Sequence, residues 1–303
     1  MSSEQNNYHV PVLLHECVEA LNILPDGVYV DTTFGGGGHS REILKHLSAK
    51  GKLIAFDQDA DAKQNLPSDE RLVFIPQNFR HLQRFLRAEG FAKVDGILAD
   101  LGVSSFQFDT AERGFSYRFD GALDMRMNVN SGRTAADILN QESAATLQQI
   151  FGEYGEVRNA KTLAEKIAEV RFQKPFKTIS DLLNVCEVVM KGDKHRYWAQ
   201  VFQALRIEVN DELSALKDLL EQSAKVLNPN GILAVITFHS LEDRLVKNFM
   251  KTGNFEGEHI KDDFGNIERL FNVKTKKPIE ANAQELKQNS RARSAKLRVA
   301  IKR

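Results

Sequence analysis

The sequence of 303 residues predicts an α/β protein, with a doubly wound parallel sheet and an inserted all-helical domain. Three observations support this prediction. Short apolar segments alternate with helix-like segments over the first hundred residues, a long helical stretch separates the fourth apolar segment from the fifth, and four glycines closely follow the first. Strands that alternate with helices pair in parallel through right-handed crossovers, which place helices on both faces of the sheet.

The predicted strands are short and rich in β-branched or aromatic residues, as is typical of strands buried on both faces. The first four lie at 28–30, 53–56, 72–75 and 97–99. Helix-like segments follow the first three of them, at 40–48, 60–65 and 79–89. The next strand is expected at 232–236, after the turn-forming sequence NPNG, and the last at 296–302.

The segment between the fourth and fifth strands is too long for a simple crossover. Asp100 and Gly231 lie 131 positions apart, and roughly ninety of these residues exceed what a crossover needs. The sequence from 134 to 206 predicts successive helices, and a further helix is expected at 211–227 with Asn210 as its N-cap. We therefore assign residues 1–108 and 210–303 to the sheet domain and 109–209 to an inserted helical domain that recognises the substrate.

The composition is that of a soluble globular protein, with 42% hydrophobic and 27% charged residues. No apolar run approaches the roughly 18 residues that span a bilayer, and the polar N-terminal segment does not resemble a signal peptide. Cys17 and Cys186 lie far apart, which argues against a disulfide framework and a zinc site. We expect a cytoplasmic protein without a membrane segment or a metal, and the sequence leaves its oligomeric state open.

The segment DTTFGGGGHS (31–40) follows the first strand and opens a helix. Glycines at a helix N-terminus let backbone N–H groups approach a ligand closely. Asp57, twenty-two positions after Gly35, ends the second strand, where a carboxylate can accept hydrogen bonds from two ribose hydroxyls. The pattern predicts a nucleoside-containing cofactor in a Rossmann-like crevice, and the alternative is a turn with a purely structural role.

A nicotinamide-dependent oxidoreductase on the same fold is the first alternative function. The dinucleotide fingerprint GxGxxG would need a third glycine at Ser40 if it began at Gly35, or at Arg41 if it began at Gly36. These two residues therefore disfavour a dinucleotide. A second alternative is a catalytically silent ribosome-binding module, against which the intact glycine loop and Asp100 argue.

The fourth strand ends in Asp100, and ligands of such sheets collect beyond the carboxyl ends of the strands. Methylation of an amine needs a positioned lone pair and oxygen acceptors for the N–H groups, which the Asp100 carboxylate and the Leu101 and Gly102 carbonyls can supply. Methylation at cytosine C5 instead needs a thiolate, and neither cysteine is near this loop in sequence. His239, just past the fifth strand, could orient a base, accept a proton or serve the structure alone.

Eight segments carry a resemblance that extends over almost the whole chain. They are HVPVLLHE (9–16), DTTFGGGGHS (31–40), DLGVSS with Gln107 and Asp109 (100–109), RGFSYRFDGALDMRM (113–127), FGEYGE (151–156), FQALRIEVNDEL (202–213), ITFHSLEDR (236–244) and NSRARSAKLR (289–298). In this order they resemble the bacterial 16S ribosomal RNA cytosine-N4 methyltransferase family. The resemblance implies a class I methyltransferase sheet, S-adenosylmethionine as methyl donor, and a cytidine in the decoding region of 16S ribosomal RNA, within the small ribosomal subunit, as acceptor.

The resemblance also implies which residues bind the cofactor. They are Gly37, Gly38 and His39 at the methionine part, Asp57 at the ribose, Phe79 near the adenine, and Asp100 and Gln107 at the adenosine side and the pocket wall. The residues alone agree for the glycines and for Asp57, whereas they favour a core position for Phe79, and Gln107 could be a surface residue. One departure is Gly36, where the family commonly has a larger or charged residue.

RNA contacts must come from local patches, because the formal net charge of the chain is zero. A base that undergoes chemistry leaves its stack, so arginines and aromatic rings are expected near the site. The predicted RNA-binding residues are Arg113, Tyr117, Arg118, Arg126, Arg196, Arg291 and Arg293. The last two belong to a segment, 287–303, with seven Lys or Arg and no acid, which a solvated basic tail would also explain. Trp198 is a further aromatic candidate, with a core position as the alternative.

Overall fold

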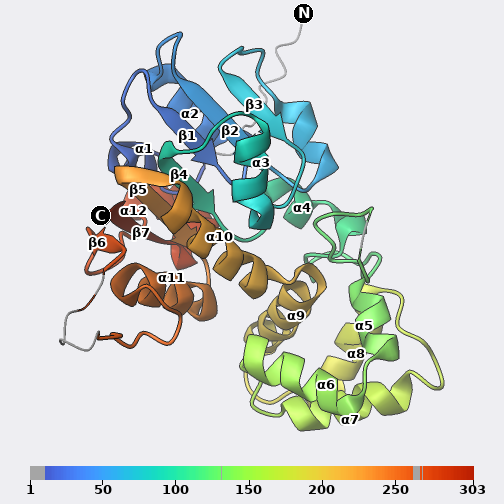
Figure 1. The fold of residues 1–303 in the computed structure, drawn as a ribbon. Coiled ribbons are helices and arrows are strands. Elements are labelled where there is room, and N and C mark those ends of the chain that lie inside the picture. Colours follow the sequence, from blue (N-terminus) through green and yellow to red (C-terminus); the bar gives the residue numbers. More distant parts are fainter. Residues whose placement is uncertain (1–10, 131, 262–266, 268) are drawn as a thin grey trace, which may run out of the picture. The chain divides into compact units, whose positions relative to one another are not determined.

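The computed structural model describes residues 11–130, 132–261, 267 and 269–303. It divides the chain into two compact units (Figure 1): one runs to Gly102 and resumes at Ala215, and the other spans Val103–Ser214. The boundaries expected from the sequence, at 109 and 209, lie inside the second unit. In the described part of the chain, no helix is both long and apolar enough to cross a bilayer.

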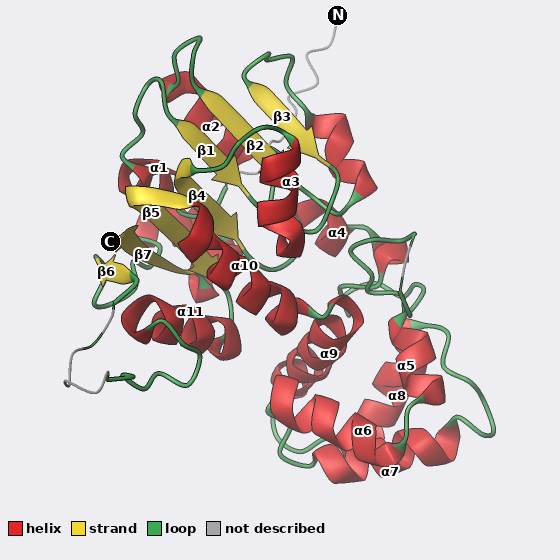
Figure 2. Cartoon of the chain, viewed as in Figure 1, coloured by secondary structure: helices red, strands yellow, loops and turns green. Residues whose placement is uncertain are grey.

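The first unit is built on a seven-stranded sheet with the order β3-β2-β1-β4-β5-β7-β6 (Figure 2). The strands are β1 (Val28–Asp31), β2 (Lys52–Phe56), β3 (Leu72–Ile75), β4 (Val94–Asp100), β5 (Leu227–Thr237), β6 (Phe271–Val273) and β7 (Lys296–Lys302). Strands β1 to β5 are parallel, and β7 runs antiparallel to β5 and β6. The strand order reverses between β1 and β4, so the carboxyl ends of these strands form the crevice where such sheets bind ligands.

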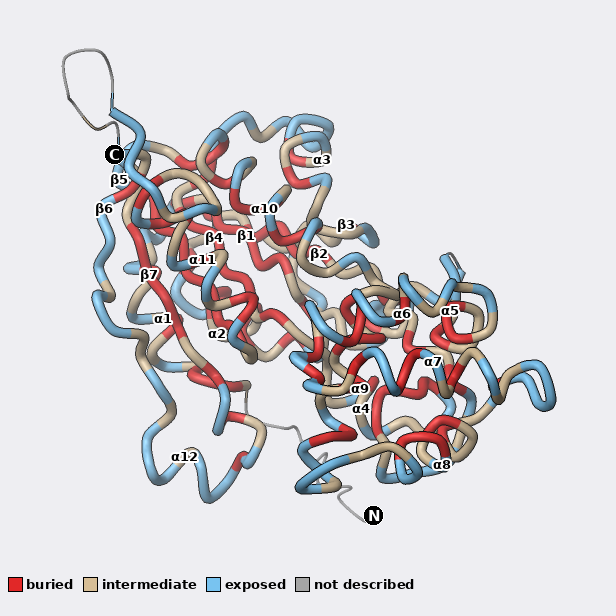
Figure 3. The backbone as a smooth tube through the Cα atoms, turned by 90° about the horizontal axis from the view of Figure 1, so that it is seen from below, coloured by how far each residue is buried: buried red, intermediate tan, exposed pale blue. Residues whose placement is uncertain are grey.

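Helices cover both faces of this sheet and bury its strands (Figure 3). On one face, α1 (Leu14–Leu21) and α2 (Gly38–His46) pack on the strands. On the other face lie α3 (Leu82–Ala88), α10 (Glu212–Val226) from residue 215 on, and α11 (Ser240–Thr252). The predicted doubly wound α/β sheet is therefore confirmed.

The second unit is helical. Its helices are α4 (Ser105–Asp109), α5 (Ala135–Gln141), α6 (Ala144–Gln149), α7 (Ala160–Val170), α8 (Ile179–Val189) and α9 (Lys194–Asn210). Among its described residues, pairing between extended segments is limited to an isolated bridge from Ala122 to Thr178. Trp198, 8% exposed, belongs to its core, which agrees with the structural alternative for this residue.

Two features of the predicted crossover back to the sheet are wrong. Asn210 is not an N-cap: it ends α9, and α10 begins two residues later, after Asp211 in the left-handed region. The Asn210 side chain accepts a hydrogen bond from the Met127 amide and donates to the Met125 carbonyl, so it braces the loop within its own unit. The sequence NPNG does not precede β5 but belongs to it, because the strand already starts at Leu227 and carries an irregularity there.

The C-terminal part of the chain holds elements that the sequence analysis missed. These are β6, the helix α12 (Ala283–Gln288) and the 3-10 helix η5 (Ser290–Ser294). The predicted strand at 296–302 is confirmed as β7, which pairs on both sides. The basic segment is thus not a free tail, and Arg298 within it is buried and paired with Asp243 through two hydrogen bonds.

Candidate active site

The glycine-rich turn between β1 and α2 has a backbone that only glycine fits at two positions. Gly37, the N-cap of α2, has φ 73°, and a Cβ there would lie 2.7 Å from the Phe34 ring. A Cβ on Gly38 would lie 2.1 Å from Pro11 Cγ. Gly36 differs, because a Cβ on it would meet no atom of the described residues within 4 Å. The departure from the family pattern at Gly36 is therefore sterically neutral, whereas Gly37 and Gly38 fix the shape of the turn.

Asp57 joins the end of β2 to this turn. Its Oδ2 accepts a hydrogen bond from the Gly35 amide at 2.7 Å, and its Oδ1 accepts one from the Asp59 amide at 2.8 Å. A carboxylate oxygen can accept more than one hydrogen bond, so both oxygens keep capacity for ligand hydroxyls. Burial raises the pKa of Asp57 to about 6, although the two amide hydrogen bonds act in the opposite direction.

Two residues that the sequence analysis missed, Arg41 and Asn65, bind the carbonyl groups of the same turn. The Arg41 guanidinium donates to the Gly36 carbonyl and, at 3.1 Å, to the Asn65 carbonyl. The Asn65 side chain in turn donates to the Gly35 carbonyl at 3.1 Å. In the sequence, Arg41 indicates only that a dinucleotide fingerprint is absent, and no local pattern links it to Asn65.

The carboxyl group of Asp100 is buried at the end of β4. Its Oδ1 has no hydrogen-bond partner among the described residues, and its Oδ2 lies 3.8 Å from His39 Nδ1. Burial, followed by the charges of Asp31 and Glu242, raises the pKa of Asp100 well above its usual range. A buried acceptor without a partner at the crevice of the sheet is suited to a ligand that brings a hydrogen-bond donor.

His39 lies between the turn and this carboxyl group. Its Nε2 contacts the Val12 carbonyl at 3.1 Å, so the proton of the neutral ring belongs on Nε2 and the Nδ1 lone pair faces Asp100. Burial lowers the pKa of His39. Although the distance would allow an ion pair, the neutral ring favoured by burial does not form one.

Asp31 at the end of β1 is a further site residue that the sequence analysis did not assign. It is 1% exposed, and it accepts hydrogen bonds from the Ser40 hydroxyl at 2.7 Å and the Thr33 amide at 3.1 Å. It therefore anchors both ends of the glycine turn. The three acids Asp31, Asp57 and Asp100 follow or end neighbouring strands, a pattern that would have found Asp31 in the sequence.

The residues after Asp100 are packed against the end of β5. The Leu101 amide donates to the Ile236 carbonyl at 3.1 Å. Gly102 has φ 96°, and its Cβ position lies 3.3 Å from the ring of Phe238. The backbone at the end of β4 thus has a fixed direction, with Phe238 as its neighbour.

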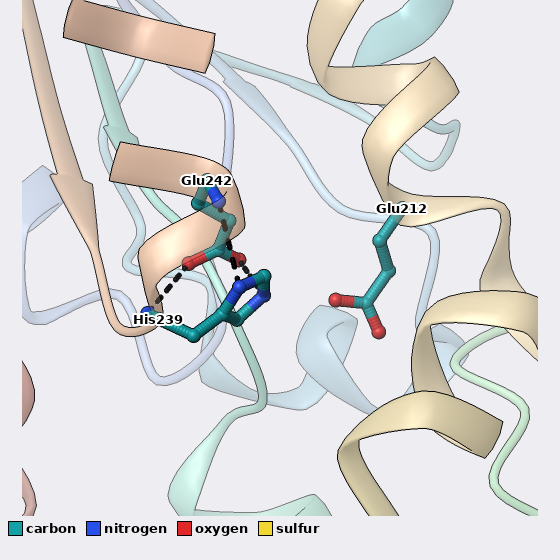
Figure 4. Close-up of side chains that lie close together, drawn as sticks. All are labelled: Glu212, His239 and Glu242. Carbon is teal, nitrogen blue, oxygen red and sulfur yellow. Dashed lines mark hydrogen bonds and ion pairs between the residues drawn. The ribbon is translucent and has the colours of Figure 1, made fainter. Parts of the chain in front are cut away.

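His239 forms a capping box with Glu242 at the start of α11 (Figure 4). Its Nδ1 accepts from the Glu242 amide at 3.4 Å, so the neutral ring carries its proton on Nε2. This contact gives His239 a structural role as the cap of α11. Glu212, also drawn there, belongs to the second unit, where it pairs with Arg206.

The other predicted cofactor residues have defined local roles. Phe79 begins the 3-10 helix η2 (Phe79–His81) and packs against the sheet core. Gln107 lies in the second unit, where its side-chain oxygen accepts from the Ser104 amide in the capping box of α4.

The predicted RNA-binding residues divide into exposed and internally used ones. Arg113 is 8% exposed and donates to the carbonyls of Arg126 and Met127, and Arg126 itself is paired with Asp124 through two hydrogen bonds. Arg118, Arg196 and Arg293 are exposed. Two residues lie between these groups: Tyr117 is half-buried, and Arg291, at the start of η5, is also partly exposed.

Comparison with known proteins matches residues 6–303 to the MraW methylase family. A protein named ribosomal RNA small subunit methyltransferase H from Parabacteroides distasonis is 54% identical over 304 residues and covers both chains fully. The protein of the same name from Cytophaga hutchinsonii is 56% identical over 97% of this chain and 99% of its own. A solved putative rRNA methylase from Clostridium thermocellum aligns over 97% of this chain and 99% of its own, at 11% identity and a TM-score of 0.47, too distant for any conclusion.

Proposed function

Because this chain belongs to the MraW methylase family, we propose that it transfers a methyl group from S-adenosylmethionine to the exocyclic N4 amine of a cytidine in the decoding region of 16S ribosomal RNA. The observation that carries the proposal is that the glycine turn, Asp57 and a carboxyl oxygen of Asp100 without a hydrogen-bond partner among the described residues lie at one edge of one sheet. The name shared by the relatives supports a substrate in the small ribosomal subunit.

The turn suits the methyl donor chemically. The backbone of Gly37 and Gly38, with His39, would hold its methionine part, Asp57 would accept from the ribose hydroxyls, and Phe79 would flank the adenosine. The fit rests on a turn without side chains at the helix N-terminus and on the remaining acceptor capacity of Asp57. When bound, the donor supplies an electrophilic methyl group on a sulfonium.

In this chemistry the protein has to orient the amine and accept one of its protons. Asp100 Oδ1 and the Leu101 and Gly102 carbonyls would accept hydrogen bonds from the N–H groups of the amine. These contacts would direct the nitrogen lone pair toward the methyl group. The raised pKa of Asp100 makes its carboxylate a better proton acceptor than an exposed one. We assign an orienting role to His239, because its Nδ1 caps the first turn of α11.

The two cysteines support nitrogen rather than carbon as the methyl acceptor. Transfer to cytosine C5 needs a reactive thiolate. Burial raises the pKa of Cys17 well above its usual range and that of Cys186 to about 12. Both thiols therefore stay protonated and are poor nucleophiles at neutral pH.

For RNA contacts we propose Arg118, Tyr117 and Arg196 in the helical unit and Arg291 and Arg293 in η5. Arg118 lies over the Phe108 ring at 5.6 Å, and Tyr117 packs against Trp198 at 5.6 Å between ring centroids. Cations interleaved with rings suit unpaired RNA. The internal hydrogen bonds of Arg113 and Arg126 favour a structural role for these two.

The proposal is tested by nucleoside mass spectrometry of 16S ribosomal RNA from a strain that lacks the gene. N4-methylcytidine should disappear and return when the wild-type gene is restored. Its persistence in the deletion strain would refute the assigned reaction. Calorimetry with S-adenosylmethionine and with a nicotinamide dinucleotide would separate the proposal from the oxidoreductase alternative.

Gly37 and Gly36 give a matched pair of substitutions in one turn. Gly37→Ala should weaken S-adenosylmethionine binding at least about tenfold, because the new Cβ meets Phe34 and a left-handed backbone disfavours alanine. Gly36→Ala should change the affinity less than about twofold, because its Cβ would lie more than 4 Å from every atom in the described part of the chain. Calorimetry on both variants checks this, and equal losses would contradict it.

The affinity for the methyl donor should fall in mildly acidic solution. Ribose hydroxyls donate best to an ionised carboxylate, and Asp57 has a pKa of about 6. As the pH falls from about 7.5 to about 5, Asp57 takes up a proton, loses acceptor capacity and binds the ribose more weakly. Calorimetry should show the dissociation constant rising with a midpoint near this pKa, and a flat profile would contradict the role of Asp57.

Arg291 and Arg293 should add affinity that depends on salt. The double substitution to Ala should weaken RNA binding by about tenfold and reduce the salt slope by about two, without changing donor affinity. The matched control is Lys50→Ala with Lys93→Ala: both lysines are exposed and precede the amino ends of parallel strands, at the opposite edge of the sheet. Unchanged RNA binding in a filter assay would count against the assignment.

A further inference from the structure

Glu242 is a buried acid to which the sequence analysis gave no role. It lies in the first turn of α11 and is 2% exposed. Its Oε2 accepts hydrogen bonds from the Phe238 amide at 2.8 Å and the His239 amide at 3.3 Å. Its Oε1 lies 3.2 Å from His239 Nε2, an electrostatic contact that is not aligned as a hydrogen bond (Figure 4).

The turn that Glu242 holds lies beside the proposed methyl-acceptor site. Phe238, whose amide it binds, has its ring 3.3 Å from the Cβ position of Gly102. The strands on either side are paired, with Asp100 opposite Ile236. A shift of the Phe238 backbone would therefore move the Phe238 ring, which lies next to the backbone of Gly102.

The charge of Glu242 also acts on the carboxyl group of Asp100. The titratable groups that interact electrostatically with Asp100 come from four elements: Asp31 on β1, His39 on α2, Cys17 on α1 and Glu242 on α11. Asp31 and Glu242 both raise the pKa of Asp100, and Asp31 has the larger effect of the two. Of these two acids, only Glu242 also binds the turn that carries Phe238.

Glu242 is the N3 acceptor of the capping box that begins α11. Two backbone amides and the N-terminus of the helix stabilise its carboxylate there. Because those amides belong to Phe238 and His239, the same side chain also fixes the turn beside the end of β4.

We propose that Glu242 is a positioning residue of the acceptor site, which fixes the Phe238–His239 turn beside the end of β4 and contributes a negative charge to the surroundings of Asp100. This inference rests on the proposed function, in which Asp100 accepts the proton of the amine. It extends that function by making the proton affinity of Asp100 depend on a residue of another element.

The experiment compares full-length wild-type protein with Glu242→Gln in methyl transfer to 16S ribosomal RNA over a range of pH. Glu242→Gln keeps one acceptor oxygen but loses the charge, so the acidic limb of the kcat profile should move to lower pH and kcat on its plateau should fall about tenfold. The KM for the methyl donor should stay within about twofold. Glu242→Ala should lower kcat further.

Asp243→Asn is the matched control, because it removes the neighbouring charge on the same helical turn, where Asp243 pairs with Arg298. It should leave the acidic limb in place. A Glu242→Gln profile that superimposes on the wild-type profile overturns the inference while wild-type transfer still supports the proposed function. Absence of transfer by the wild-type protein overturns both.

Discussion

Asp57→Ala should lower the affinity for S-adenosylmethionine by about 100-fold or more. Hydrogen bonds to a charged group contribute about 1.5–3 kcal/mol each, and about 1.4 kcal/mol corresponds to a factor of ten in affinity. Two ribose hydroxyls would lose their acceptor in this variant. The Gly35 amide would lose its partner as well, so the glycine turn would also be less well ordered before binding.

Asp57→Asn separates these two contributions. The amide side chain keeps one acceptor oxygen, which can bind either the Gly35 amide or a ribose hydroxyl well, so its affinity should lie between those of wild type and Asp57→Ala. Calorimetry on the three proteins measures this order. Binding by Asp57→Ala within about threefold of wild type would remove Asp57 from the cofactor site.

Whereas replacing Asp57 weakens cofactor binding, removing its charge is not expected to destabilise the fold. Burial raises the pKa of Asp57 to about 6, so ionisation costs the folded state free energy, and this cost appears as the pH rises from the usual aspartate pKa to the folded-state value. It reaches about 3 kcal/mol above that range. Asp57→Asn should therefore unfold at no lower temperature than wild type at neutral pH, which shows that a loss of binding is not a loss of fold.

The sheet could be predicted because its information is local in the sequence. Each buried strand is a short apolar segment, and the glycine turn with Asp57 at a fixed distance identifies the cofactor edge. The start of β5 was misplaced because NPNG is a turn signal in isolation, whereas β5 pairs with β4 on both sides of it, at Leu227 and again from Ile232. β6 is only three residues long, too short for a pattern to indicate.

The remainder of the site depends on contacts between residues far apart in the chain. His39 follows β1 and Asp100 ends β4, so only the pairing of these strands brings the two side chains together. The hydrogen bond from Arg41 to the Asn65 carbonyl joins segments that share no motif. Arg113 and Arg126 look like surface cations in the sequence, but their partners are backbone carbonyls and Asp124. Glu242 could have been found from its spacing after His239, because a capping box needs a carboxylate or amide three residues later.

Asp100→Asn should lower kcat by about 100-fold to 10,000-fold while the affinity for S-adenosylmethionine falls less than about tenfold. Asparagine can still accept a hydrogen bond from the cytosine amine, but it cannot take up the proton that the amine loses. Because burial raises the pKa of Asp100 well above its usual range, wild-type kcat should increase with pH beyond the range where an exposed aspartate is already ionised. The variant should lack this acidic limb.

Single-turnover kinetics at saturating donor, with 16S ribosomal RNA or small subunits as acceptor, separate the chemical step from binding. Asp57→Asn provides the reciprocal control, since it should lose affinity but recover most of kcat at saturation. The raised pKa means that ionised Asp100 costs the folded state stability at neutral pH, so Asp100→Asn should unfold at no lower temperature than wild type. A kcat within about threefold of wild type, or a loss of kcat that only matches the loss of donor affinity, would show that the amine proton leaves by another route.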